Sequence, residues 1–79
     1  MQATMYTKSP CSYCDRAKML FKYKNVSVNE INAIDNASEM SAKVFAATGF
    51  PPKTVPQIWL GDQYIGGFQE LVEYYKQNP

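Results

Sequence analysis

The stretch that decides the fold is residues 3–24, which read ATMYTKSPCSYCDRAKMLFKYK. An apolar-leaning run over residues 3–6 is stopped by the TKSP segment at residues 7–10, which predicts a short strand followed by a loop. From residue 12 to residue 24, apolar groups recur at i, i+3, i+4 and i+7, which predicts an amphipathic helix. These groups are Ala17, Leu20, Phe21 and the aliphatic stem of Lys24. Two cysteines therefore lie where the loop becomes the helix.

The middle of the chain carries a second strand signal and a second helix signal. Residues 26–31 show an imperfect alternation of β-branched side chains, which is typical of a strand. A helix is predicted over residues 37–48, with Asn36 and Glu39 as a capping box and Gly49 as the residue that ends it. The predicted inner face of this helix is formed by Met40, Val44 and Ala47.

Two short apolar runs and a last helix complete the pattern. Residues 57–60 and 63–65 are joined by a Gly-Asp pair, which predicts a hairpin, and helical spacing resumes after Gly66 and Gly67. The predicted order is βαβαββα. This is an α/β fold in which three helices cover both faces of one four-stranded mixed sheet. The residues predicted to lie in the core or at its edge are Met5, Phe45, Phe50, Ile58 and Trp59.

The length, net charge and apolar content of the chain argue against several classes of protein, including multidomain, nucleic-acid-binding and membrane proteins. Its 79 residues predict one domain, 1–79, without repeats or linkers. A formal net charge of +1 gives no electrostatic reason to expect nucleic acid or an anionic membrane as the main partner. No apolar run approaches the roughly 18 residues of a membrane span, and the first residues lack the layout of a signal peptide. We therefore expect a cytoplasmic protein.

The chemistry of the chain is concentrated in its two cysteines, Cys11 and Cys14. In a reducing compartment a C-x-x-C pair indicates redox or metal chemistry before it indicates a structural disulfide. Because the chain has no histidine, it offers neither a Cys-His nucleophile nor the four ligands of a self-contained zinc site. Half of a metal site shared with another chain stays open as an alternative to redox chemistry.

The position of Cys11 at the predicted helix start makes it the candidate nucleophile. Unpaired backbone N–H groups and the positive end of the helix dipole favour a thiolate there. Cys14 lies one turn further along the helix, close enough to attack a mixed disulfide on Cys11, and is the candidate resolving thiol. Lys8 adds a positive charge near the same place, whereas Asp15 acts weakly in the opposite sense.

Three separated motifs resemble those of the glutaredoxins. They are Cys-Ser-Tyr-Cys at residues 11–14, Thr-Val-Pro-Gln at residues 54–57 and Gly-Gly-Phe at residues 66–68. The resemblance extends over residues 4–76 and implies a thioredoxin-like fold, which has the same βαβαββα order. It also implies a glutathione-dependent thiol–disulfide oxidoreductase that reduces glutathione mixed disulfides and protein disulfides.

The resemblance also implies roles for residues around the cysteines. It implies a cis peptide between Val55 and Pro56, and the exposed backbone of Val55 then pairs with glutathione as a strand edge does. The γ-glutamyl carboxylate is expected at the start of the last helix, and the glycine end beside Lys8, Tyr13 and Lys53. The complete set of residues expected to bind glutathione is Lys8, Tyr13, Lys53, Thr54, Val55, Pro56, Gly67, Phe68 and Gln69.

Two departures from the family pattern leave alternatives open. Gln69 stands where many relatives have an acidic residue, which weakens the expected bond to the γ-glutamyl ammonium. Ser12 stands where many dithiol members have proline, and some Cys-Ser-Tyr-Cys relatives bind a [2Fe-2S] cluster between two subunits. In that case Cys11 and glutathione would be ligands. The alternatives are therefore an iron–sulfur cluster carrier or assembly module, and an electron donor reduced by thioredoxin reductase.

The expected partners follow from the leading function. Glutathione is the co-substrate, no metal is required, and the protein substrates carry disulfides or bound glutathione, with ribonucleotide reductase among the candidates. We expect a monomer that binds neither nucleic acid nor membrane. A basic run on the first helix is a candidate surface for steering acidic protein partners. It consists of Arg16, Lys18, Lys22 and Lys24.

Overall fold

A computed structural model describes the whole chain, residues 1–79. Its elements, in chain order, are β1 (Gln2–Thr7), α1 (Ser12–Tyr23), β2 (Ser27–Asn32), α2 (Ala37–Thr48), β3 (Gln57–Leu60), β4 (Gln63–Gly66) and α3 (Phe68–Gln77). The predicted βαβαββα order is confirmed, and the predicted boundaries differ from these by at most one residue. None of the helices combines the length and the apolar character that a membrane span requires.

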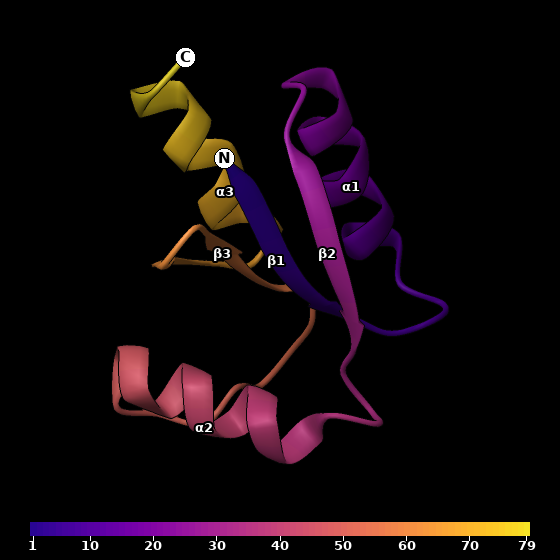
Figure 1. Cartoon of the computed structure of the whole chain (residues 1–79), viewed down its shortest axis with the longest axis vertical. Helices are drawn as coiled ribbons and strands as arrows, with labels where there is room; N and C mark the ends of the chain where they lie inside the picture. The colour runs from indigo at the N-terminus through magenta and orange to yellow at the C-terminus, as the bar shows by residue number, and fades with distance from the viewer.

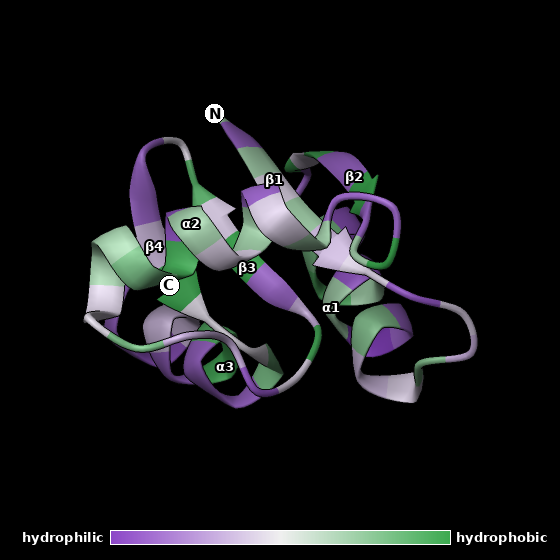
Figure 2. Ribbon diagram, turned by 90° about the horizontal axis from the view of Figure 1, so that it is seen from below, coloured by the Kyte–Doolittle hydropathy of each residue, from purple (hydrophilic) through white to green (hydrophobic).

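The four strands form one mixed sheet in the order β2-β1-β3-β4. β1 is parallel to β2, with α1 as the crossover between them, and β3 is antiparallel to both β1 and β4. Figure 2 shows both hydrophilic and hydrophobic residues along the edge strand β2, and the two hydrophobic ones, Val28 and Ile31, pack against different core clusters. Because successive side chains of a strand point to opposite faces, the central strands β1 and β3 supply both layers of the core.

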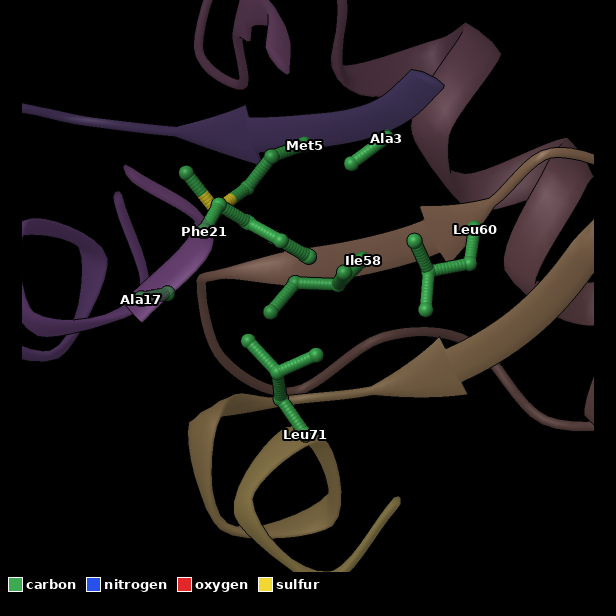
Figure 3. Close-up of a cluster of buried hydrophobic side chains, with 7 residues drawn as sticks. All are labelled: Ala3, Met5, Ala17, Phe21, Ile58, Leu60 and Leu71. Atoms are coloured by element: carbon green, nitrogen blue, oxygen red, sulfur yellow. The ribbon is translucent and has the colours of Figure 1, made fainter. Parts of the chain in front are cut away.

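The larger core lies between the sheet and the helices α1 and α3, which cover the same face (Figure 1). Figure 3 shows side chains from β1, α1, β3 and α3 meeting in this layer. The seven buried residues are Ala3, Met5, Ala17, Phe21, Ile58, Leu60 and Leu71. Ala17 and Phe21 lie one turn apart on the predicted apolar face of α1. Their burial fixes the start of this helix, and with it the cysteines, against the sheet.

A smaller core lies on the opposite face, under α2 (Figure 1). The rings of Tyr6 and Trp59 meet edge to face there, with centroids 5.6 Å apart. Ala33 and Val44 complete this cluster, and the ammonium group of Lys43 lies 4.5 Å from the Trp59 ring centroid. Because Val44 is the only buried residue of α2, this helix is held by less apolar surface than α1.

The predicted capping box of α2 is wrong, although the predicted end of the helix is confirmed. The side chain of Asn36 makes no capping hydrogen bond, and the carboxylate of Glu39 instead accepts one from the hydroxyl of Tyr6. A buried hydroxyl requires a partner, so Glu39 serves the core rather than the helix terminus. Gly49 ends the helix with a φ of 80°, and its N–H donates to the carbonyl of Phe45.

Three apolar residues that were predicted to be buried are exposed. The exposed fractions are 58% for Phe45 and 71% for Phe50, and Ala47 is also exposed. Phe45 follows the buried Val44, and one residue turns an α-helix by about 100°, which carries Phe45 away from the sheet. Phe50 lies beyond the end of the helix. The other predicted core residues, Met5, Ile58 and Trp59, are buried as expected.

The hydrogen bond from Tyr6 to Glu39 predicts a pH-dependent contribution to stability. Burial, reinforced by the Glu39 carboxylate, raises the pKa of Tyr6 to about 12. Since an unfolded tyrosine has a pKa of about 10, the contribution is complete below pH 10 and is lost as the pH rises toward 12. We expect Tyr6→Phe to lower the free energy of unfolding by about 1 kcal/mol at neutral pH, and this difference to vanish near pH 12.

Urea unfolding of the two proteins over this pH range, followed by circular dichroism, measures the difference. The matched control is Tyr23→Phe, because Tyr23 is 80% exposed. Its difference from the wild type should stay near zero throughout. A Tyr6→Phe difference that remains constant up to pH 12 would contradict the argument.

Candidate active site

The two cysteines lie at the start of α1, as predicted. Cys11 is the N-cap residue, and its sulfur accepts a hydrogen bond from the backbone N–H of Cys14 at 3.1 Å. The two side chains form a disulfide, with their Cα atoms 5.3 Å apart. Cys14 is 1% exposed, whereas Cys11 is partly exposed. An external thiol or disulfide therefore has access to Cys11 and not to Cys14.

The loop before β3 brings the second motif to the cysteines. The peptide bond between Val55 and Pro56 is cis, which confirms what the resemblance implied. The carbonyl oxygen of Val55 lies 3.9 Å from the sulfur of Cys11. The backbone of Val55 and the redox-active sulfur therefore border the same space, although 44 residues separate them in sequence.

Gln57 holds this loop in place. Its buried side-chain amide donates to the carbonyl of Thr54 at 2.8 Å, and its amide oxygen accepts from the hydroxyl of Tyr64 at 2.6 Å. Burial, and to a smaller extent the charge of Glu70, raises the pKa of Tyr64, so the hydroxyl remains a donor. The sequence signal for this positioning role is a polar residue that opens an otherwise apolar strand.

The third motif forms the start of α3. Gly66 has a φ of 115°, a conformation that favours glycine, and a Cβ there would lie 3.0 Å from the side chain of Glu70. The Glu70 carboxylate accepts a hydrogen bond from the N–H of Gly67 at 2.7 Å. The next N–H groups, those of Phe68 and Gln69, have no partner within the helix. They are the donors that the sequence predicted for a carboxylate.

A cavity of about 300 Å³ joins these segments. Its lining residues are Tyr13, Thr54, Val55, Pro56, Gly67, Phe68, Gln69 and Glu70. Seven of them belong to the set expected to bind glutathione. Glu70 is the member that the sequence did not indicate, because a glutamate in a first helical turn is usually solvated. The rings of Tyr13 and Phe68 lie 6.1 Å apart, centroid to centroid, and form part of the wall.

The remaining two residues of that set, Lys8 and Lys53, line a neighbouring hollow. This hollow shares Thr54 and Val55 with the cavity, so the two spaces adjoin. Neither lysine forms an ion pair with a carboxylate of the chain. Both ammonium groups are therefore available to an anionic group of a ligand beside Val55.

A cluster of charged side chains surrounds Glu30, near the start of α1 where the cysteines lie. Its carboxylate accepts hydrogen bonds from the Thr7 hydroxyl at 2.6 Å and from Lys18 at 3.2 Å. The Thr7 hydrogen bond, together with Lys18, lowers the pKa of Glu30. Lys18 also lies 3.6 Å from the carboxylate of Asp15. The charge of Asp15 is therefore partly compensated, which weakens its predicted influence on Cys11.

Within the chain, no group of three or more His, Cys, Asp and Glu side chains comes together to hold a metal ion. An iron–sulfur cluster would thus take part of its ligands from glutathione or from a second copy. The cluster-binding alternative stays a prediction.

Comparisons with known proteins bear on both fold and site. A family model described as Glutaredoxin matches residues 3–65. A glutaredoxin of Pseudomonas aeruginosa is 42% identical over 67 residues, which cover 85% of this chain and 76% of that protein. Glutaredoxin 1 from Francisella tularensis, solved in complex with cacodylate, is 30% identical with a TM-score of 0.71, over 96% of this chain and 93% of that one. The protein in a buckwheat glutaredoxin–glutathione complex is 26% identical, with a TM-score of 0.78. The match covers 96% of this chain and 69% of the buckwheat chain.

The thioredoxin-like fold and the cysteine pair at the start of α1 define a thiol–disulfide oxidoreductase. Within that class, the chain belongs to the glutaredoxin family.

The difference in exposure between the two cysteines predicts unequal alkylation. After reduction of the disulfide, iodoacetamide should modify Cys11 at least about tenfold faster than Cys14, because Cys14 is 1% exposed. Mass spectrometry of the digested protein after short reaction times measures both rates. A control in about 6 M urea should label the two cysteines at similar rates. Equal rates in the folded protein would contradict the assigned exposure.

Proposed function

We propose that the protein is a glutathione-dependent reductase of glutathione mixed disulfides and protein disulfides. The observation that carries this proposal is the cavity beside Cys11, which brings seven expected residues together and adjoins two unpaired lysines. A volume of about 300 Å³ lies at the small end of ligand cavities and suits a tripeptide. The similar buckwheat protein was solved as a glutathione complex, which supports the same ligand here.

In the proposed complex, glutathione lies along Val55 as an added strand. Its cysteinyl backbone pairs with the N–H and C=O of Val55, which places its sulfur next to Cys11. Its γ-glutamyl carboxylate accepts from the free N–H groups at the start of α3. Its glycine carboxylate faces Lys8 and Lys53, where a charge-assisted bond forms without competition from a carboxylate of the chain.

The proposed reaction proceeds by two thiol–disulfide exchanges. The thiolate of Cys11 attacks the glutathione sulfur of a mixed disulfide, and the substrate cysteine leaves as a thiolate that takes a proton from water. A second glutathione, as its thiolate, then attacks the adduct on Cys11 and leaves as glutathione disulfide, which restores the Cys11 thiolate. With a protein disulfide, the Cys11 thiolate bonds to one substrate sulfur and the other substrate cysteine leaves as a thiolate. Cys14, after losing its proton to water, attacks Cys11, the first substrate cysteine leaves as a thiolate, and the Cys11–Cys14 disulfide forms. Two glutathiones then reduce this disulfide and leave as glutathione disulfide.

A coupled assay tests this function. The substrate is the mixed disulfide of glutathione and cysteamine, and the reductant is glutathione with glutathione reductase and NADPH. We expect turnover in this system and none when thioredoxin reductase replaces the glutathione components. The reverse result would favour the electron-donor alternative. Brown colour and visible absorption after anaerobic purification would favour the cluster carrier.

The different exposure of the two cysteines predicts different roles: Cys11 reacts with the substrate, and Cys14 resolves the adduct only when glutathione does not. Cys11→Ser should abolish all turnover, because no other thiol of the chain meets the substrate. Cys14→Ser should keep reduction of the cysteamine disulfide, since external glutathione resolves the adduct, but should lose at least about 90% of its activity on a protein disulfide. Initial rates with both substrates provide the measurement. Loss of both activities in Cys14→Ser would mean that the roles are wrongly assigned.

The neutral side chain of Gln69 is expected to limit the affinity of the protein for glutathione. It lines the cavity as a neutral amide, and the neighbouring carboxylate of Glu70 is engaged with the N–H of Gly67. Gln69→Asp should therefore lower the KM for glutathione about threefold or more, because a carboxylate binds the γ-glutamyl ammonium more strongly. The matched control is Gln63→Asp, since Gln63 lies outside the cavity. An unchanged KM would show that the ammonium already has a sufficient partner.

A further inference from the structure

A second apolar hollow, of about 350 Å³, lies between α1 and α3. Its apolar lining consists of Leu20, Tyr23, Phe68, Val72 and Tyr75. The two helices lie on the same face of the sheet (Figure 1) and run in the same direction. Tyr13 is next to Phe68 near their starts, and Phe21 is next to Tyr75 further along, with ring centroids 6.1 and 6.3 Å apart. The hollow therefore follows both helices away from the active site.

Three cationic side chains and no carboxylate line this hollow. Arg16 and Lys24 lie over tyrosine rings, at 5.3 and 5.0 Å from the ring centroids, and neither pairs with a carboxylate. The third cation, Lys76, has only an exposed contact of 4.0 Å with Glu73. Such cations remain available to an acidic ligand, and the aromatic rings beneath them restrict where they lie.

The basic run of α1 is thus divided between different roles. Lys18 is bound to Glu30 on β2, so its charge is used within the chain. Lys22 is exposed and does not line the hollow. Of this basic run, Arg16 and the C-cap residue Lys24 line the hollow, and the eight-residue separation along the helix places them roughly 12 Å apart along its axis.

The hollow adjoins the active site. Phe68 lines both this hollow and the cavity beside Cys11, and the ring of Tyr13 packs against it. A polypeptide whose cysteine reaches Cys11 can therefore enter the hollow by passing over Phe68.

We propose that the hollow between α1 and α3 docks an acidic and apolar segment of the protein substrate, close in sequence to its reactive cysteine. This inference rests on the proposed function, because it names the class of protein that the same active site reduces. Two carboxylates about 12 Å apart fit an extended chain with a rise of about 3.3 Å per residue when they are four residues apart. The residue midway between them points to the same side, so a large apolar side chain there meets the apolar lining.

Docking leaves the chemistry unchanged. The Cys11 thiolate still bonds to the glutathione sulfur, the mixed disulfide breaks, and the cysteine of the docked segment leaves as a thiolate that takes a proton from water. Docking raises the rate at which that disulfide reaches Cys11, because complementary charges speed encounter.

Three synthetic peptides test the proposal, each carrying glutathione as a mixed disulfide on its cysteine. The first is Cys-Gly-Gly-Glu-Ser-Leu-Ser-Glu, the second has glutamine for both glutamates, and the third has serine for the leucine. We expect the wild type to show a kcat/KM about fivefold higher for the first peptide than for either other peptide at low ionic strength. About 0.5 M salt should remove the advantage over the glutamine peptide.

Variants that change the charge of single lysines show which of them causes the preference for the acidic peptide. Lys24→Glu should remove the preference for the acidic peptide, and Lys24→Gln, which adds no carboxylate at the end of α1, should remove about half of it. The matched control is Lys22→Glu, which makes the same change of charge on the same helix outside the hollow and should retain the preference. Val72→Gln should reduce the preference for leucine. All four variants should reduce the cysteamine disulfide at the wild-type rate.

The outcomes separate this proposal from the proposed function. Equal rates for the three peptides, with normal turnover of the cysteamine disulfide, would overturn the docking site alone. Loss of turnover on every substrate in the wild type would overturn both. Equal losses in Lys22→Glu and Lys24→Glu would indicate unspecific attraction and overturn the docking site. Dimerisation in sedimentation experiments that Val72→Gln abolishes would assign the hollow to a second copy and overturn it as well.

Discussion

The sulfur of Cys11 accepts the hydrogen bond that the first turn of α1 would otherwise leave open. A helix start has backbone N–H groups without partners, and oxygen side chains usually satisfy them. Once the disulfide is reduced, we expect the same donors and the helix dipole to stabilise a thiolate in this position. The arrangement requires that α1 does not shift. Ala17 and Phe21, both fully buried against the sheet, hold the helix in place.

The rest of the site depends on holding two other segments against that sulfur. Gln57 shapes the loop before β3 through hydrogen bonds to Thr54 and Tyr64. Leu71 anchors α3 in the same core as α1. The three segments of the cavity are thus fixed by one shared apolar layer and one buried amide.

Local patterns predicted most of the fold, because α1 and α3 have apolar residues on one face and the strands are bounded by turn residues. They failed where a distant partner decides the outcome. Glu39 has the spacing of a capping residue, yet the hydroxyl of Tyr6, 33 residues away, takes its carboxylate. The roles of Glu70 and Gln57 were overlooked for another reason. Their partners are near in sequence, Gly67 for Glu70 and Thr54 and Tyr64 for Gln57, but a polar residue at a helix start or a strand start is usually solvated. The three motifs were predictable, but the cavity that joins them required the packing of α3 against α1.

The parallel course of α1 and α3 directs the positive ends of two helices toward one cavity. The chain has a net charge of only +1, so no long-range positive field attracts anions. The positive potential at the cavity is confined to its surroundings, and the backbone dipoles of the two helix starts contribute to it. The electric field of a helix dipole comes from its peptide groups, so it does not depend on which side chains lie on the helix surface. An exchange of lysines or arginines along α1 therefore changes the charge of the surface but leaves the helix dipole at Cys11 unchanged.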